Sequence, residues 1–274
     1  MIRLAFVLLF FATATTVDAQ PSLTIKEESL NFDSLTNSQR SIKKVGHLSN
    51  EDAEKRGFDL KLHTALADGK TGRQCTDELI SAQWNQDVWH FFNSEAHFDN
   101  CAFASSLNYI RELRGSTGKA IENKDIKSAL KGLGQILHAI QDFYAHSNYV
   151  ELMHTEYNDF SRVPIISIWN NDGESTIKQL LPKGLISGIW KASLTSSKFC
   201  GDKGLTHSQL AKDNTSTTSG EKILDKWHKT GFEAAYSLAD NASFEFLQWA
   251  YKEWPLLEET CGPIIGYGLL FERR

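Results

Sequence analysis

The sequence lacks several features that would place it in a common class of protein. No run approaches the roughly 20 uncharged apolar residues that a membrane-spanning helix needs. Lysine and arginine number 29 against 34 aspartates and glutamates and form no long basic run, so the electrostatic footprint of a nucleic-acid-binding protein is missing. There is no Gly-x-Ser-x-Gly, phosphate-binding glycine loop or His-Glu-x-x-His. A membrane span, nucleic acid as a partner, and the serine hydrolase, nucleotide-binding and metalloprotease classes are therefore not expected.

The first 19 residues are typical of a signal peptide. Arg3 precedes a short apolar run from Leu4 to Ala12, and Val17-Asp18-Ala19 forms a small-x-small cleavage signal. We therefore expect a secreted, extracellular protein. Residues 20–44 are polar and aperiodic and are expected to be a disordered leader. Residues 45–274 contain no repeat, low-complexity tract or linker and are expected to form one domain.

Export would allow cysteines to form disulfides and asparagines to be glycosylated. No Cys-x-x-Cys occurs, which argues against a cysteine zinc cluster. An even number of cysteines in an exported chain predicts two disulfides, and three pairings are open. Asn214 and Asn241 both match the N-glycosylation pattern; Asn214 is the better candidate because Asn241 falls inside an expected helix. The disulfide candidates are Cys75, Cys101, Cys200 and Cys261.

Apolar periodicity predicts an all-α fold with long loops. The region between Tyr157 and Asn214 contains prolines and glycines that predict loops with short helices. Longer helices are expected at about Ser49 to Ala67, Cys101 to Leu113, Asp125 to Leu152 and Lys222 to Trp254.

The third of these helices carries a polar stripe in an otherwise apolar segment. Asp142 is the only formally charged side chain between Lys131 and Glu151, so the helix is expected to be buried on most sides. At 100° per residue, His138, Asp142 and His146 share one face. A buried carboxylate is costly unless it is paired or bound to a metal. The stripe is thus either a hydrogen-bonded His-Asp-His network or a metal site.

Two further places offer ligands to the same cation. His97 and Asp99 lie two residues apart in a segment expected to be extended, where both can point the same way. His47 comes just before an expected helix start. Imidazole and carboxylate without thiolate suit zinc and are typical of hydrolytic sites with a metal-activated water. His63 and His90 have no acidic partner at helical spacing, and we interpret them as packing or surface histidines.

Residues 132–152 read Gly-Leu-Gly-Gln-Ile-Leu-His-Ala-Ile-Gln-Asp-Phe-Tyr-Ala-His-Ser-Asn-Tyr-Val-Glu-Leu. This string resembles the Het-C family, named for a fungal heterokaryon-incompatibility protein and also found at the N-terminus of an animal protein with a von Willebrand A domain. The resemblance covers roughly Val45 to Leu247. Supporting matches are Gly46-His47, His97-Phe-Asp99, the segment Lys183 to Gly188, Lys212-Asp213, and His228.

The Het-C family more distantly resembles bacterial zinc-dependent phospholipase C and fungal zinc-dependent single-strand nucleases, which are helical and carry a three-zinc cluster. His138 and Asp142 match their His-x-x-x-Asp pair, in which the aspartate bridges two zincs. The resemblance implies a phospholipase C-like helical domain with catalytic roles for Asp99 and Asp142. The implied zinc ligands are His47, His97, Asp99, His138, Asp142 and His146. Further candidates are Glu151, His154, His207 and His228.

Two functions are therefore expected from the sequence. The first is a zinc-dependent phosphoester hydrolase acting on phospholipid head groups or another phosphodiester. The alternative is a non-catalytic extracellular recognition or cell-surface protein that keeps the same scaffold.

Overall fold

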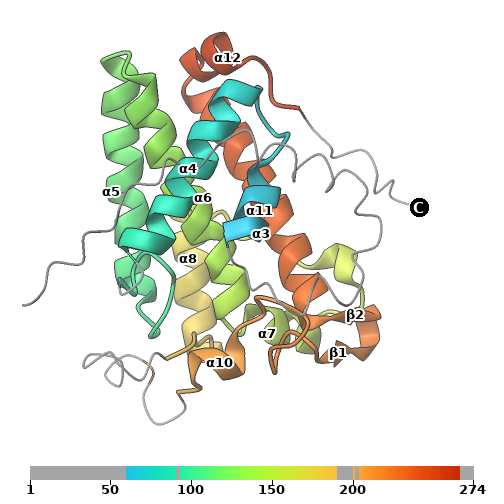
Figure 1. Ribbon diagram of the computed structural model, residues 1–274. Coiled ribbons are helices and arrows are strands. Elements are labelled where there is room, and N and C mark those ends of the chain that lie inside the picture. Colours follow the sequence, from blue (N-terminus) through green and yellow to red (C-terminus); the bar gives the residue numbers. More distant parts are fainter. Residues whose placement is uncertain (1–59, 91–92, 190–199, 201–203, 266–274) are drawn as a thin grey trace, which may run out of the picture. The chain divides into compact units, whose positions relative to one another are not determined.

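The computed structural model describes residues 60–90, 93–189, 200 and 204–265 (Figure 1). Within these ranges the chain is mostly helical, and its one sheet pairs two strands of two residues each. The predicted all-α class is confirmed. The expected signal peptide and leader lie outside the described residues, as does His47. No helix in the described ranges has both the length and the apolar character needed to cross a membrane.

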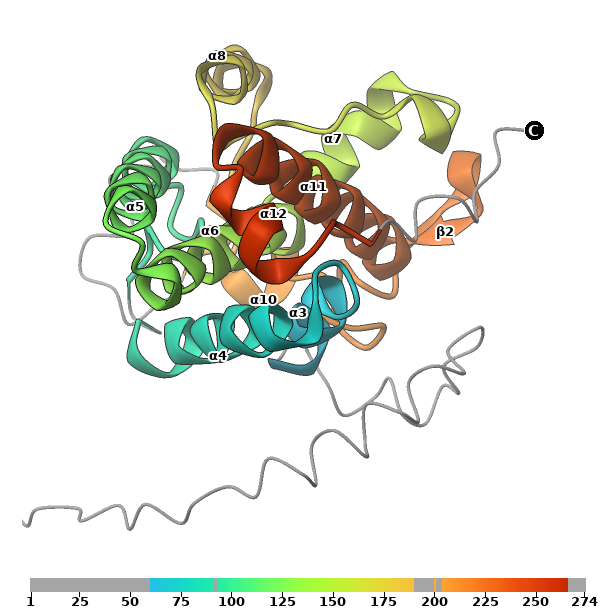
Figure 2. The same ribbon diagram turned by 90° about the horizontal axis from the view of Figure 1, so that it is seen from above.

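A long central helix, α6, is surrounded by other helices along its length. Seen from above, these neighbours lie on different sides of α6 (Figure 2). The central helix therefore buries most of its circumference, as its lack of charge predicts. The helices of this bundle are α3 (Leu60–Ala67), α4 (Arg73–Trp89), α5 (Phe103–Glu122), α6 (Ile126–His146) and α11 (Gly231–Glu253).

The burial of α6 follows from its residues. Leu133, Ile136 and Phe143 are fully buried, and removing each such side chain from water stabilises the fold by about 1.5–3 kcal/mol. Gly134 allows α4 to approach closely, because a Cβ at this position would lie 2.6 Å from the carbonyl oxygen of Leu79. The polar stripe of α6 is consequently enclosed along with its apolar face.

The end of α6 and the start of α11 differ from those that the sequence predicts. The helix expected to run from Asp125 to Leu152 ends at His146, because Ser147 is extended, and α7 (Tyr149–Glu156) follows as a separate helix. The helix expected from Lys222 begins only at residue 231. The preceding residues form an antiparallel pair of β1 (Ile223–Leu224) and β2 (Lys229–Thr230), and Thr230 and Glu233 form a capping box at the start of α11.

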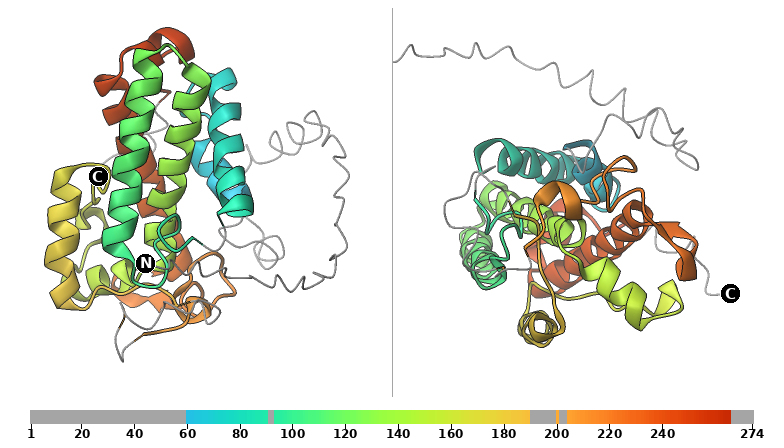
Figure 3. Two further views of the ribbon diagram at one scale, coloured as in Figure 1. Left: turned by 90° about the vertical axis from the view of Figure 1, so that its left-hand side faces the viewer. Right: turned by 90° about the horizontal axis from the view of Figure 1, so that it is seen from below.

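α4 is not among the helices that the sequence predicts, and α5 continues to Glu122 rather than ending near Leu113. α10 packs against α6 and lies below its C-terminal end in the left view of Figure 3. The shorter elements are α8 (Asn171–Leu180), α10 (His207–Leu210), α12 (Leu256–Cys261) and 3₁₀ turns at Phe160–Arg162, Leu181–Lys183 and Asp225–Trp227.

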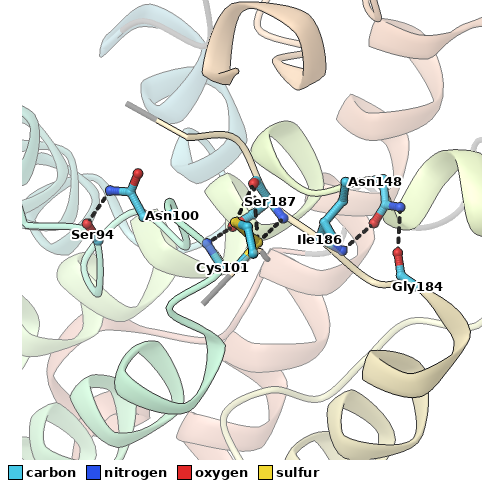
Figure 4. The surroundings of a disulfide bond; sticks show 8 residues. Ser94, Asn100, Cys101, Asn148, Gly184, Ile186 and Ser187 are labelled. Carbon is cyan, nitrogen blue, oxygen red and sulfur yellow. Dashed lines mark hydrogen bonds between the residues drawn. A yellow bond between two sulfur atoms is a disulfide. The ribbon is translucent and has the colours of Figure 1, made fainter. Parts of the chain in front are cut away.

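Two disulfides close the fold, as the sequence predicts. Of the three open pairings, the structure has Cys75–Cys261 and Cys101–Cys200. The first joins the start of α4 to the end of α12. The second lies at the turn that follows His97 and Asp99 (Figure 4).

Candidate metal centre

Histidine and aspartate side chains from distant parts of the chain converge on the C-terminal half of α6. The helix presents His138, Asp142 and His146, and the other groups come from α3, α4, the segment 93–102 and the segment 204–213. We divide them into two clusters. The inner cluster is Asp87, His97, His138 and Asp142, and the outer cluster is Asp99, His146, His207 and Asp213.

In the inner cluster the ligand atoms are spaced like those around one ion. His138 Nε2 lies 2.9 Å from Asp142 Oδ2, 3.1 Å from His97 Nδ1 and 3.4 Å from Asp87 Oδ1. His97 Nδ1 is 2.8 Å from Asp142 Oδ2. Tetrahedral zinc, with ligand bonds of about 2.0–2.2 Å, separates its ligand atoms by about 3.3 Å. Asp87, His97 and His138 each offer an atom within 4.8 Å of the others, and Asp142 Oδ2 adjoins the two imidazoles of that group.

His63 approaches the second oxygen of Asp142. Its Nε2 lies 3.3 Å from Asp142 Oδ1, and its ring stacks on His138 with the ring centroids 4.0 Å apart. Its Nδ1 contacts Gln141 Oε1 at 2.5 Å. Asp142 Oδ1 is buried and accepts no hydrogen bond within the described part of the chain. The two oxygens of Asp142 therefore face two separate positions for a cation.

This placement corrects the interpretation of His63 as a packing or surface histidine. Its acidic neighbour is on a different helix, so no spacing within α3 could reveal it. His90, interpreted in the same way, contributes a backbone carbonyl 3.2 Å from His97 Nε2 and helps to orient that ring.

The outer cluster is an alternating arrangement of imidazoles and carboxylates. His207 Nδ1 lies 3.0 Å from Asp99 Oδ1, and His146 Nε2 lies 3.2 Å from Asp213 Oδ1. Two longer approaches connect these pairs, His146 to Asp99 at 3.6 Å and His207 to Asp213 at 3.7 Å. His146 Nε2 is also 3.9 Å from Asp142 Oδ1, so the two clusters adjoin.

The electrostatics of the centre favour positive charge. Burial would raise the pKa of Asp142, but the imidazoles of His138, His146 and His63 hold it well below its usual value. Burial would lower the pKa of His63, but the Asp142 carboxylate raises it to about 9. Burial, with charge on His63 adding to it, lowers the pKa of His138 to about 4. The carboxylates thus raise the pKa values of His63 and His146 and favour protons on these two rings, and a divalent cation could take the place of those protons.

A tight turn aims two ligands in different directions. Phe98, Asn100 and Cys101 have φ values of 53°, 56° and 54°, a region that residues other than glycine adopt infrequently and mostly where surrounding structure enforces it. The enforcing contacts are visible in Figure 4: Asn100 Nδ2 donates to Ser94 Oγ, and the Cys101 amide donates to Ser187 Oγ at 2.8 Å. The turn places His97 in the inner cluster and Asp99 in the outer one.

The extended segment 185–189 holds the outer ligands together. The backbone amide of Gly188 donates to the carbonyl of His146 at 3.0 Å, and the carbonyl of Gly188 accepts from the backbone amide of Asn100 at 2.8 Å. The amide of His207 donates to the carbonyl of Ile189 at 3.0 Å. Asn148 anchors the segment through its side-chain amide, which bonds the backbone at positions 184 and 186 (Figure 4). The three ligand-bearing segments of the outer cluster therefore share one backbone scaffold.

Replacing Gly188 by Ala is expected to disturb this scaffold. A Cβ at Gly188 would lie 2.6 Å from the Cα of His207 and 3.2 Å from its amide nitrogen, so the His207 backbone must move. We expect a loss of about 1–3 kcal/mol in the free energy of unfolding and weaker metal binding by the outer cluster. Gly115→Ala is the matched control, because a Cβ there meets nothing within 4 Å. Equal stability and metal affinity for the two variants would contradict the scaffold role.

The chain also matches a known family over part of its length. Residues 61–170 match the family model of the VWA7 N-terminal domain. The matched range contains His63, the inner cluster, Asp99 and His146, whereas His207 and Asp213 lie beyond it. No curated protein and no solved structure matches the chain.

Several predicted ligands have other partners. Glu151 lies 3.4 Å from the Lys212 ammonium, and His154 lies 3.0 Å from Asp225. His228 is exposed between β1 and β2. Of the further candidates, only His207 is brought to the centre; His47 is outside the described residues.

Asp87 and Asp213 join the centre without having been predicted as ligands. Asp87 belongs to α4, a helix that apolar periodicity does not reveal, and Asp213 has no sequence signal besides the Lys212-Asp213 match to the Het-C family. Both glycosylation candidates lie in the described part of the chain. Asn241 is exposed on α11, whereas Asn214 is half-buried and its side-chain oxygen accepts bonds from the amides of residues 216 and 217.

Proposed function

We propose that this chain is a secreted, zinc-dependent phosphoester hydrolase built on a phospholipase C-like domain that spans residues 45–274. The observation that carries the proposal is the position of Asp142. One oxygen of this buried carboxylate lies near His97 and His138, and the other lies near His63. An unpaired charge in such a buried setting is costly. The resemblance of α6 to the Het-C family, and through it to the zinc enzymes, adds support.

The residues fit zinc. The donors are imidazole nitrogens and carboxylate oxygens, the set that zinc takes in hydrolytic sites. The inner cluster would hold one ion, His63 with Asp142 Oδ1 would contribute to a second position, and the outer cluster would hold another. Bound zinc supplies a water of lowered pKa and neutralises the charge that develops on a phosphoryl group.

The protein's own contribution is to bury some of the ligands and leave others partly exposed. Asp142 and His138 side chains are 1% and 0% exposed, so they cannot rearrange freely. The side chains of Asp87 and Asp213 are 25% and 19% exposed. A phosphoester substrate would therefore reach the centre past these two aspartates.

Secretion is supported by two features. The chain has two disulfides, which persist in oxidising compartments and are rare in the cytosol. Its first 19 residues are typical of a signal peptide.

A substrate panel tests this proposal. The secreted protein is assayed on a chromogenic phosphodiester, on phosphatidylcholine vesicles and on single-stranded DNA, before and after treatment with a chelator. We expect phospholipid head-group cleavage that the chelator abolishes and added zinc restores, with weak action on DNA because the chain carries a net charge of −5. Metal-loaded protein without turnover on any substrate would support the non-catalytic recognition function instead.

A further inference from the structure

Lys212 is a fully buried cation next to the outer cluster. Its side chain is 0% exposed. The ammonium donates to the carbonyls of Ser147 at 2.7 Å and Leu210 at 2.8 Å, and lies 3.4 Å from Glu151 Oε1. Burying an ammonium group costs several kcal/mol unless its donors are satisfied. Each of its three donors has a partner here, so Lys212 occupies a site built for a cation.

The partners of Lys212 are the ends of ligand-bearing helices. Ser147 follows His146, the last residue of α6, and Leu210 is the last residue of α10, which begins at His207. A cation is favourable at the C-terminal end of a helix, where carbonyl groups lack partners. The backbone of Lys212 adds a third link, because its amide donates to the carbonyl of Ala145 at 3.0 Å.

This geometry links the segments of two ligands, His146 and His207, through one side chain. The bond to Ser147 fixes the end of α6 beside His146, and the bond to Leu210 fixes the helix that carries His207. Asp213 is the next residue along the chain, and its carboxylate contacts His146 at 3.2 Å. The inner cluster takes its ligands from α4 and the segment 93–102, which contribute no group that the Lys212 ammonium bonds, and from His138 and Asp142, which lie further from the end of α6 than His146 does.

We propose that Lys212 is a positioning residue for the outer cluster, and that a divalent cation bound by Asp99, His146 and His207 depends on it. This inference rests on the proposed metal centre. It predicts that removing the ammonium weakens metal binding at the outer cluster and leaves the inner cluster unaffected.

The test is a zinc titration of the full-length, metal-stripped protein in which calorimetry measures the heat of binding. His207→Ala identifies the binding event of the outer cluster, and Asp87→Asn identifies that of the inner cluster. In Lys212→Met we expect outer-cluster affinity to fall about 10–100-fold, the usual cost of losing a group that orients a ligand, with inner-cluster affinity unchanged. Lys222→Met is the matched control, because residue 222 is an exposed lysine in the same region and the charge change is the same.

Two further readouts separate positioning from a general structural role. The variant combining Lys212→Met with His207→Ala should bind no more weakly than His207→Ala alone, since both changes act on the same event. In the cobalt-substituted protein, only the visible absorption assigned to the outer cluster should change. Additive losses, or equal weakening of both clusters, would overturn the proposal.

Lys212→Gln replaces Lys212→Met if the latter does not fold, because its amide can still donate a hydrogen bond but carries no charge. Loss of the outer binding event in this variant supports the proposal. A folded variant that keeps both events at wild-type affinity overturns it while leaving the proposed metal centre intact. A wild-type protein that takes up no zinc overturns the metal centre itself, and the role of Lys212 with it.

Discussion

Replacing Asp142 by Asn is expected to remove most of the bound zinc and nearly all phosphoester hydrolysis. The change keeps the size of the side chain but removes the charge that faces His63 on one side and His97 and His138 on the other. Altering a group that merely orients a ligand costs about 10–100-fold in metal affinity, so loss of a shared ligand should cost more than about 100-fold. Elemental analysis and the phosphodiester assay measure the two effects.

The same substitution should also destabilise the metal-free protein. The neighbouring imidazoles lose the carboxylate that compensates their burial, and breaking a buried ion pair costs about 3–5 kcal/mol. Asp240→Asn is the matched control, because Asp240 pairs with Lys70 and takes no part in either cluster. If Asp142→Asn retains its zinc and its turnover, Asp142 is not a metal ligand and the hydrolase proposal fails.

Removing the Cys101–Cys200 disulfide should damage both stability and the outer cluster. Its cysteines are 99 residues apart, and those of Cys75–Cys261 are 186 apart. Loss of either cross-link is expected to lower the free energy of unfolding by about 4–5 kcal/mol through the freedom gained by the unfolded chain. Cys101 also ends the turn that carries Asp99, so only the loss of the Cys101–Cys200 disulfide should weaken metal binding.

The two paired serine variants are compared directly. Chemical denaturation should show similar losses for both, while zinc titration should show a weakened outer binding event only in Cys101→Ser/Cys200→Ser. The Cys75→Ser/Cys261→Ser variant controls for the general cost of losing a disulfide. Unchanged outer-cluster affinity in the first variant would mean that the hydrogen bonds that the Cys101 and Asn100 amides donate to Ser187 and Gly188 suffice to hold the turn.

The local part of the centre could be predicted from the sequence because it follows from helical geometry. His138, Asp142 and His146 recur at intervals of four residues, so one face of α6 collects them whatever surrounds the helix. The absence of other charges predicts that this face is buried, and the side chain of Asp142 is indeed 1% exposed. Likewise, an even number of cysteines predicts two disulfides without predicting which sulfurs meet.

The remaining groups depend on contacts between elements and leave no local signal. His63 reaches Asp142 across the contact between α3 and α6, and Asp87 reaches His138 from α4. α4 has polar residues on several sides and contains buried Gln83 and Gln86, so its apolar pattern is weak. The break at Ser147 also escapes prediction, because the extended backbone there is held by a bridge to Ser187 from a distant loop.

The most direct test of the account is the metal content of the protein, purified without a metal-affinity step or chelator and measured by native mass spectrometry. We predict about two or three zinc ions per chain, since Asp142 faces two positions and the outer cluster forms another. Acidification should release these ions, because imidazole ligands bind metal only when they are unprotonated. A folded, disulfide-bonded protein that carries no metal and takes up none from solution would contradict the account.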